Sequence, residues 1–192
     1  LVAFMFKDTK ILGVKIPFHV NFEEVNLRFY VRHKADGEYR RGVVFIKEIV
    51  PKGAISFVAN TFYNENYETR KMRHVWNKKP KGLQVQYEWL VQNQWQKITA
   101  DAKKEAVEIA EKSEAEFITE HYYGYTKKTQ SKSYEYEVTH PRWKQYVVKD
   151  YKIEIDYGLV YGEKFAFLKN QEPVSVMLAE GSVITVENKR VI

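Results

Sequence analysis

The chain has 192 residues, of which 44% are apolar and 29% charged, and its formal net charge is +6. This length suits one domain with a substantial core, and this composition argues against intrinsic disorder. The chain has no cysteine, which excludes disulfides, thiolate metal sites and a cysteine nucleophile. No signal peptide is visible, and no apolar run approaches the roughly 18 residues that span a bilayer. We therefore expect a cytoplasmic protein with no membrane partner.

The first third of the chain is predicted to form strands around one helix. Strands are expected at Val2–Phe6, Val25–Val31 and Gly42–Val50, with Val14–Phe18 leading into the second. Lys34–Glu38 has the composition of a hairpin turn, and the strand Gly42–Val50 is apolar enough to be buried on both faces. Ala54–Phe62 has apolar residues at helical spacing, which predicts a short buried helix closed by Asn64–Asn66.

The rest of the chain is predicted to be mainly strands as well. These are expected at Tyr67–Trp76, Leu83–Val91, Trp95–Ala102, Ser133–Thr139 and Tyr151–Tyr157. Ser113–Glu116 matches a capping box, which predicts a helix to about His121. Val174–Leu178 and Val183–Val186 flank a turn and predict a final hairpin. The predicted fold class is α+β and mainly antiparallel β, with two or three short helices, in a single domain over residues 1–192.

The run Phe22–Val31 carries the clearest indication of function, because period-two spacing gives it two unlike faces. One face is an ordinary apolar core face formed by Val25, Leu27, Phe29 and Val31. The other face holds Glu24, Asn26, Arg28 and Tyr30. An amide, a guanidinium and a phenol in one row can grip a small polar ligand. We therefore predict that Asn26, Arg28 and Tyr30 bind a ligand.

Two further groups of polar and aromatic residues are candidates for the same site. Tyr63, Asn66 and Tyr67 follow the predicted buried helix and form a candidate ligand-binding group. Glu116 and Glu120 lie one helical turn apart, so either carboxylate could act as a base or as a counter-ion for Arg28. The alternative places Glu116 in the helix cap and the neighbouring tyrosines in the core.

The five histidines are scattered, and none stands four residues from another, so no metal site is predicted. His140 is the most informative of them, because Pro141 makes the backbone after it rigid and Trp143 can anchor it. It could reach into the mouth of a barrel as a catalytic group, or it could form a structural corner.

A basic run, Arg70–Lys81, includes Trp76 and could hold a nucleic-acid backbone. The alternative is the charged outer face of a strand followed by a Lys/Pro turn. No nucleic-acid-binding motif accompanies the run, so we predict no nucleic-acid partner. An exposed strand face and this basic patch are compatible with a homodimer.

Four long stretches of the chain resemble one known family. They are PFHVNFEEVNLRFYVRHK, RRGVVFIKEIVPKGAISFVANTFYNENYETRKM, SEAEFITEHYYGYTKK and YEYEVTHPRW, and they occur in order and with similar spacing over nearly the whole chain. The chain thus resembles the YqjF-like family, an uncharacterised bacterial family grouped with the acetoacetate-decarboxylase-like fold. Members usually carry a segment before the part that matches Leu1, so the resemblance implies that the first strand or two are missing here.

The resemblance implies a cone-shaped antiparallel β-barrel that encloses a pocket. In acetoacetate decarboxylase a lysine in a Gly-Phe-Pro-Lys-Lys run forms a Schiff base, and its neighbour lowers the pKa of that lysine. The similar stretch here is Asn64–Glu68, in which Tyr67 and Glu68 take the lysine positions. The other lysine pairs, Lys78–Lys79, Lys103–Lys104 and Lys127–Lys128, fall in highly charged stretches where desolvation is weak. We therefore expect no Schiff-base decarboxylase, and no metal or organic cofactor.

Two functions are compatible with these residues. The first is a small-molecule binding protein in which Arg28 holds an anionic group and Asn26, Tyr30, Tyr63 and Tyr67 shape the rest of the pocket. The second is an enzyme of the tautomerase, dehydratase or lyase type, acting on a carboxylate or carbonyl compound. Its acid or base would come from Glu48, Glu116, Glu120 or His140. A third alternative is purely structural: Arg28 forms a buried ion pair with Glu48 on the neighbouring strand.

Overall fold

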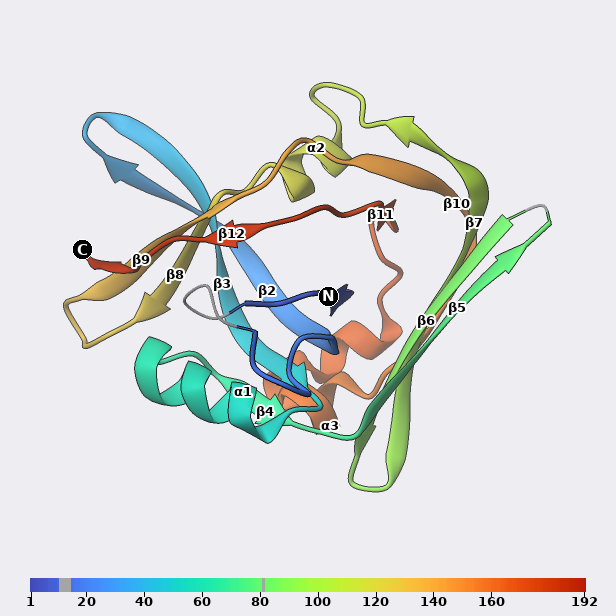
Figure 1. Ribbon diagram of the computed structural model, residues 1–192, viewed down its shortest axis with the longest axis horizontal. Helices are drawn as coiled ribbons and strands as arrows, with labels where there is room; N and C mark the ends of the chain where they lie inside the picture. Colours follow the sequence, from blue (N-terminus) through green and yellow to red (C-terminus); the bar gives the residue numbers. More distant parts are fainter. Residues whose placement is uncertain (11–14, 81) are drawn as a thin grey trace.

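The computed structural model describes residues 1–10, 15–80 and 82–192, and its strands form two sheets (Figure 1). The first contains β1 (Val2–Phe6), β2 (Phe22–Ala35), β3 (Glu38–Val50), β4 (Tyr67–Thr69), β8 (Tyr123–Lys127), β9 (Ser133–Thr139), β12 (Thr185–Val186) and β13 (Arg190–Val191). The second contains β5 (Met72–Lys79), β6 (Gly82–Val91), β7 (Gln94–Glu108), β10 (Lys144–Glu154) and β11 (Leu178–Ala179). Only the contacts of β3 with β4 and β8 are parallel among the described strands, so the predicted α+β, mainly antiparallel class is confirmed.

In Figure 1, β2 and β3 cross the middle of the molecule, and β7 and β10 curve along its right side. The hairpin between β2 and β3 is closed by Asp36 and Gly37, whose φ angles are 53° and 87°. Two successive positive φ angles are typical of a type I′ turn, which suits the twist of paired strands. The predicted turn at Lys34–Glu38 and the strand at Gly42–Val50 are therefore confirmed. Residues 44–47 of this strand are only half-buried, so its expected burial on both faces is confirmed only at its ends.

A helical segment follows β3, as predicted, but it lies on the surface. It consists of α1 (Gly53–Val58) and a π-helical turn, Ala59–Tyr63, which ends at Asn64 with a left-handed backbone. Phe57 and Phe62 are 65% and 61% exposed, so the expected burial of this helix is wrong. Only one side of it packs against the sheet, because the chain has no element that covers the other side in the described ranges.

The second predicted helix is present as α2 (Glu114–Thr119). The Ser113 hydroxyl accepts a hydrogen bond from the Glu116 N–H at 3.1 Å, as a capping residue does. The Glu116 carboxylate accepts the N–H of Lys112 at 2.6 Å, one residue before the partner that a capping box predicts.

Two strand predictions are wrong at the points where the chain changes sheet. The expected strand Tyr67–Trp76 is divided, because β4 pairs with β3 whereas β5 pairs with β6. The expected final hairpin does not form, because β11 joins β10 and β12 joins β9. In both cases the partner strands lie far away in the sequence. Of the two predicted hairpin strands only Leu178 and Thr185–Val186 are strand, so that prediction is largely wrong. Val14 and Lys81 lie outside the described residues.

The expected strand Tyr151–Tyr157 is displaced by several residues. β10 ends at Glu154, and Tyr157 starts the short helix α3 (Tyr157–Tyr161), followed by a 3₁₀ helix at Glu163–Asn170. The Asp156 carboxylate accepts the N–H of Leu159 at 2.9 Å, so an N-cap ends the strand that alternation alone would extend.

The main core lies between β2 and β3 on one side and β6 and α3 on the other. Trp89, Val25 and Ile49 are 0% exposed, and Leu27 and Val160 also belong to this core. The predicted apolar face of β2 is thus confirmed at Val25 and Leu27. Phe29 is 48% exposed, so the prediction of a core position is wrong there. No helix in the described ranges is long and apolar enough to cross a membrane.

Candidate functional site

The polar face of β2 is buried and gathers acidic groups from neighbouring strands. Glu24 and Asn26 are 2% and 1% exposed, and Glu48 of β3 is 3% exposed. Glu48 lies directly opposite Asn26 in the β2–β3 register, and directly opposed residues project from the same face of a sheet. Glu48 is in turn beside Tyr67 in the parallel pairing of β3 with β4.

Hydrogen bonds connect several of these side chains. The Asn26 amide nitrogen donates to Glu24 Oε1 at 2.9 Å, and the Tyr67 hydroxyl donates to Glu24 Oε2 at 3.2 Å. Glu65, just before β4, and Tyr136 of β9 lie near enough for their charges to act on Glu48 and Glu24. We call Glu24, Asn26, Glu48, Glu65, Tyr67 and Tyr136 the carboxyl–tyrosine cluster.

The carboxyl groups of this cluster hold protons unusually well. Burial raises the pKa of Glu24 from 4.5 to about 7, against smaller opposing effects of Asn26, Tyr67 and Arg28. Burial, aided by the charges of Glu24 and Glu65, raises the pKa of Glu48 well above its usual value. Burial also raises the pKa of Glu65 to about 7. The cluster therefore contains protonated carboxyl groups near neutral pH.

The two tyrosines in the cluster are held as neutral phenols. Burial and the neighbouring Glu24 and Glu48 raise the pKa of Tyr67 well above 10. Burial and the charge of Glu65 do the same for the pKa of Tyr136. Both hydroxyls are thus hydrogen-bond donors throughout the physiological pH range.

Arg28 lies two residues beyond Asn26 on β2, at one end of the cluster. Its Nε is buried and has no hydrogen-bond partner, and its guanidinium lies 5.5 Å from the centre of the Tyr30 ring. No ion pair joins Arg28 to Glu48 in the described ranges, so the structural alternative of a buried Arg28–Glu48 pair is wrong. In the β2–β3 register Glu48 faces Asn26, whereas Arg28 faces Phe45.

His121, which follows α2, completes this end of the site. Its ring lies 4.5 Å from the Tyr30 ring and 4.8 Å from the Phe117 ring. Burial, followed by the positive charges of Arg28 and Arg41, lowers the pKa of His121 from 6.5 to about 4. The imidazole is therefore neutral at pH 7, and its buried Nδ1 has no hydrogen-bond partner.

The predicted catalytic candidates Glu116, Glu120 and His140 form a separate group. Glu116 pairs with Arg142 at 2.8 Å, and Glu120 accepts a hydrogen bond from the Tyr122 hydroxyl. The His140 ring stacks on Trp143 at 4.3 Å, which matches the alternative of a structural corner. None of these contacts connects the group to the carboxyl–tyrosine cluster.

Tyr63 and Asn66 have contacts of other kinds. The Lys189 ammonium lies 5.0 Å from the centre of the Tyr63 ring. The Asn66 side chain donates to the Ile46 carbonyl at 2.6 Å, and its own carbonyl accepts the N–H of Glu48 at 3.0 Å. Asn66 therefore fixes β3 to the segment that leads into β4. Of Tyr63, Asn66 and Tyr67, only Tyr67 has a side-chain hydrogen bond to a member of the cluster in the part of the chain that the structure describes.

Four residues of the site were not assigned to it from the sequence. Glu24 was placed on the correct face of its strand, and its parity with Asn26 and Arg28 was a usable signal. His121 was set aside with the other scattered histidines, although it follows a predicted helix. Glu65 and Tyr136 lie 71 residues apart in the chain, and no pattern in the sequence around either residue indicates that they meet.

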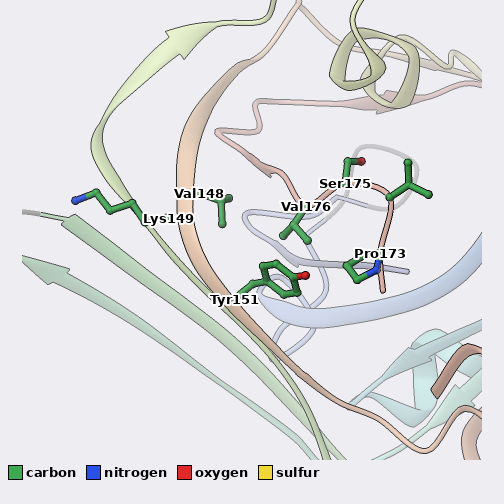
Figure 2. Close-up of a pocket in the computed structure, with 7 residues that line it drawn as sticks. Val148, Lys149, Tyr151, Pro173, Ser175 and Val176 are labelled. Atoms are coloured by element: carbon green, nitrogen blue, oxygen red, sulfur yellow. The ribbon is translucent and has the colours of Figure 1, made fainter. Parts of the chain in front are cut away.

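Two surface hollows lie away from Arg28. One, of about 270 Å³, lies between β10 and residues 173–176 (Figure 2). Figure 2 shows Val148 and Tyr151 projecting toward Pro173 and Val176, while Lys149 points to the other side of the strand. The Tyr151 hydroxyl is bound to Glu172 at 3.1 Å. This hollow contains none of the predicted site residues and no cluster of carboxyl groups.

The second hollow, of about 200 Å³, borders the carboxyl–tyrosine cluster. It is lined by Tyr136 of the cluster and by Arg40, Glu135 and Arg190, which form an ion-pair network. Across residues 1–10, 15–80 and 82–192, no three His, Asp or Glu side chains are grouped so that they could hold a metal ion.

Gly124 of β8 is required for the position of Tyr136, because a Cβ at this glycine would collide with the Tyr136 ring. We expect Gly124→Ala to lower the free energy of unfolding by about 2 kcal/mol, as overpacking does in well-packed interiors. Urea denaturation measures this change. Gly53→Ala is the matched control, because the nearest atom to its Cβ would be 3.9 Å away. Equal stabilities of the two variants would contradict the close packing of Tyr136 on β8.

Comparison with known proteins places the chain in a family. A search of curated proteins gave no match. The sequence profile of DUF2071, described as an uncharacterised conserved protein family (COG2071), matches residues 1–183. The resemblance to the YqjF-like family is consistent with this match. Because the match covers nearly the whole length, the chain belongs to the DUF2071 family of uncharacterised conserved proteins.

Proposed function

We propose that the chain binds a small anionic organic molecule between Arg28 and the carboxyl–tyrosine cluster. The observation that carries this proposal is the Arg28 guanidinium, whose buried Nε has no hydrogen-bond partner. Buried or half-buried charges are generally paired, because an unpaired charge is costly to remove from water. A carboxylate from a ligand supplies both the missing acceptor and the missing negative charge.

The surroundings of Arg28 leave its charge available to a ligand. Glu24 and Glu48 are close enough for the charge of Arg28 to act on them, and burial favours their neutral forms. Tyr30 and the neutral His121 ring contribute polar surfaces without a counter-charge. The hydroxyl of Tyr67 and the amide of Asn26 add groups that can fix the orientation of a polar ligand.

A second candidate function is acid–base catalysis on the bound molecule, of the tautomerase, dehydratase or lyase type. The observation that favours it is the pKa of about 7 for both Glu24 and Glu65. A group with a pKa near the working pH is the most efficient general acid or base. This function is tested by following deuterium incorporation into bound oxo acids and hydroxy acids by NMR. Deuterium incorporation that is abolished in Glu24→Gln supports catalysis. If the wild type binds an acid tightly but incorporates no deuterium, the protein binds the acid without catalysing this exchange.

Schiff-base chemistry is not part of the proposal. Tyr67 and Glu68 occupy the positions that would need lysines, and Glu68 pairs with Lys47 at 2.8 Å. Lys78, Lys103 and Lys127 lie in exposed stretches, as expected for turn and surface lysines. A cytoplasmic location and a homodimer stay predictions from the sequence.

The proposal is tested by a thermal-shift screen of small carboxylic, hydroxy and oxo acids. A ligand present at about 100 times its Kd adds roughly 2.7 kcal/mol to the free energy of unfolding of the wild type. We expect Arg28→Gln to abolish this stabilisation, because it removes the cation and keeps a polar side chain. Arg32→Gln is the matched control, since Arg32 is an exposed arginine on the same strand. If no acid stabilises the wild type, or if Arg28→Gln binds as well as Arg32→Gln, the proposal fails.

A further inference from the structure

Three buried side-chain oxygens in the carboxyl–tyrosine cluster have no hydrogen-bond partner. They are Asn26 Oδ1, Glu48 Oε2 and Glu65 Oε1. Asn26 and Glu48 are only 1% and 3% exposed, so bulk water does not satisfy these atoms. The Asn26 amide nitrogen is already bound to Glu24, which fixes its oxygen as the free end of the side chain. An ionised carboxyl group or an amide oxygen without a donor is costly to bury, and a ligand that brings a donor here would remove that cost.

Asn26, Arg28 and Glu48, which each hold a buried unpartnered atom, belong to the paired strands β2 and β3. Asn26 and Arg28 are two residues apart on β2, which corresponds to about 7 Å along a strand. Glu48 faces Asn26 across the β2–β3 pairing. A ligand that lies along β2 therefore meets a positive group at one end and a set of acceptors at the other.

We infer that the ligand is a small zwitterion, whose carboxylate binds Arg28 and whose ammonium binds Asn26, Glu48 and Glu65. This inference rests on the proposed function and narrows its ligand class. An ammonium group carries three N–H donors, which equals the number of unpartnered acceptors. Because the Cα atoms of Asn26 and Arg28 are about 7 Å apart, we expect an amino group several carbons from the carboxylate to fit better than an α-amino acid.

The charges of the cluster favour an ammonium over a neutral hydroxyl. Glu24, Glu48 and Glu65 are three acids in one buried region, and Arg28 has the smallest named effect on the pKa of Glu24 and of Glu48. A cation placed among them stabilises their ionised forms, which burial otherwise disfavours.

Isothermal titration calorimetry with matched ligands tests the inference. The wild type is titrated with 4-aminobutanoate, 5-aminopentanoate and 6-aminohexanoate, and with the acids, hydroxy acids and amines of the same length. We expect at least one amino acid in the series to bind about tenfold or more tightly than both the acid and the hydroxy acid that match it. Glycine is expected to bind more weakly than the longer amino acids.

Substitutions on the acceptor side separate the two ends of the ligand. We expect Glu48→Gln to remove the advantage of the amino acid over the matching acid, because it removes the negative charge and keeps the volume. Glu111→Gln, at an exposed glutamate, is the matched control and should keep the full advantage. Should Glu48→Gln fail to fold, Glu65→Gln gives the same comparison.

The outcomes distinguish this inference from the proposed function. If acids and hydroxy acids bind as tightly as the amino acids, the zwitterion inference is overturned while the anion site at Arg28 stands. If amines bind without a carboxylate and Arg28→Gln does not weaken them, both are overturned. If none of these ligands binds the wild type but a larger set of acids does, the inference alone fails.

Discussion

Glu24→Gln should make the protein more stable at pH 8 by about 3 kcal/mol. The native pKa of Glu24 is about 7, against 4.5 for an unburied glutamate. A difference of about 2.5 between the native and unfolded pKa values corresponds to about 3 kcal/mol of unfolding free energy. Glutamine resembles the protonated carboxyl group, which the buried site prefers, and it can still accept the hydrogen bond from Asn26.

The pH dependence has a definite sign. Between pH 4.5 and 7 the native state binds a proton at Glu24 that the unfolded state has released. The free energy of unfolding of the wild type therefore falls as the pH rises through this window, and this contribution levels off above pH 7. Glu24→Gln lacks the titrating group, so its advantage should vanish near pH 4.5 and be complete near pH 8.

Urea denaturation of both proteins at pH 5, 6, 7 and 8 measures this difference. Glu111→Gln is the matched control, because Glu111 is exposed and its substitution should leave the pH dependence of the wild type unchanged. A wild type that is more stable than Glu24→Gln at pH 8 would mean that the carboxylate is ionised and paired in the native state. The cluster would then no longer be a group of protonated acids, and the charge of Arg28 would be neutralised from within.

The fold was predictable where a pattern is local. The turn at Asp36 and Gly37 needs two positive φ angles, and the alternation on either side of it fixes the β2–β3 hairpin. Local patterns do not name distant partners, which is why the division at Arg70 and the separation of β11 from β12 were missed. Arg70 donates its N–H to the Val50 carbonyl at 3.0 Å, a contact that no periodicity predicts.

The candidate site was predictable to the same extent. Parity along β2 identified the row of Asn26, Arg28 and Tyr30, and register with β3 adds Glu48. Glu65 and Tyr136 could not be assigned, because tertiary packing of β4 and β9 brings them to this face. Glu116 and His140 were assigned to the site on chemical type alone, and the Arg142 ion pair and the Trp143 stacking show that their roles are local.

Glu135 is a buried glutamate that, unlike Glu24, is paired with arginines, and its removal should lower the stability of the protein. It is 2% exposed, and its carboxylate accepts hydrogen bonds from Arg40 at 2.9 Å, from Arg190 at 2.7 Å and from the Tyr125 hydroxyl at 3.0 Å. These partners come from β3, β13 and β8, so the carboxylate of one β9 residue connects four strands of the first sheet. Two of the partners of Glu135 are cations, Arg40 and Arg190. The hydrogen-bond partners of Glu24, Asn26 and Tyr67, are both neutral.

We expect Glu135→Ala to lower the free energy of unfolding by about 3 kcal/mol, since it leaves the partners of a buried carboxylate without an acceptor. Arg190 is 57% exposed and can be solvated after the substitution. The loss of unfolding free energy should therefore lie at the lower end of the range for a broken buried ion pair. Glu137→Ala, at an exposed glutamate on the same strand, is the control for the loss of a charge from β9. Equilibrium denaturation of both variants at pH 8 measures the difference, and equal stabilities would contradict the network. Compared at that pH with Glu24→Gln, Glu135→Ala tests whether pairing decides the stability effect of a buried glutamate, since one substitution should stabilise the protein and the other should destabilise it.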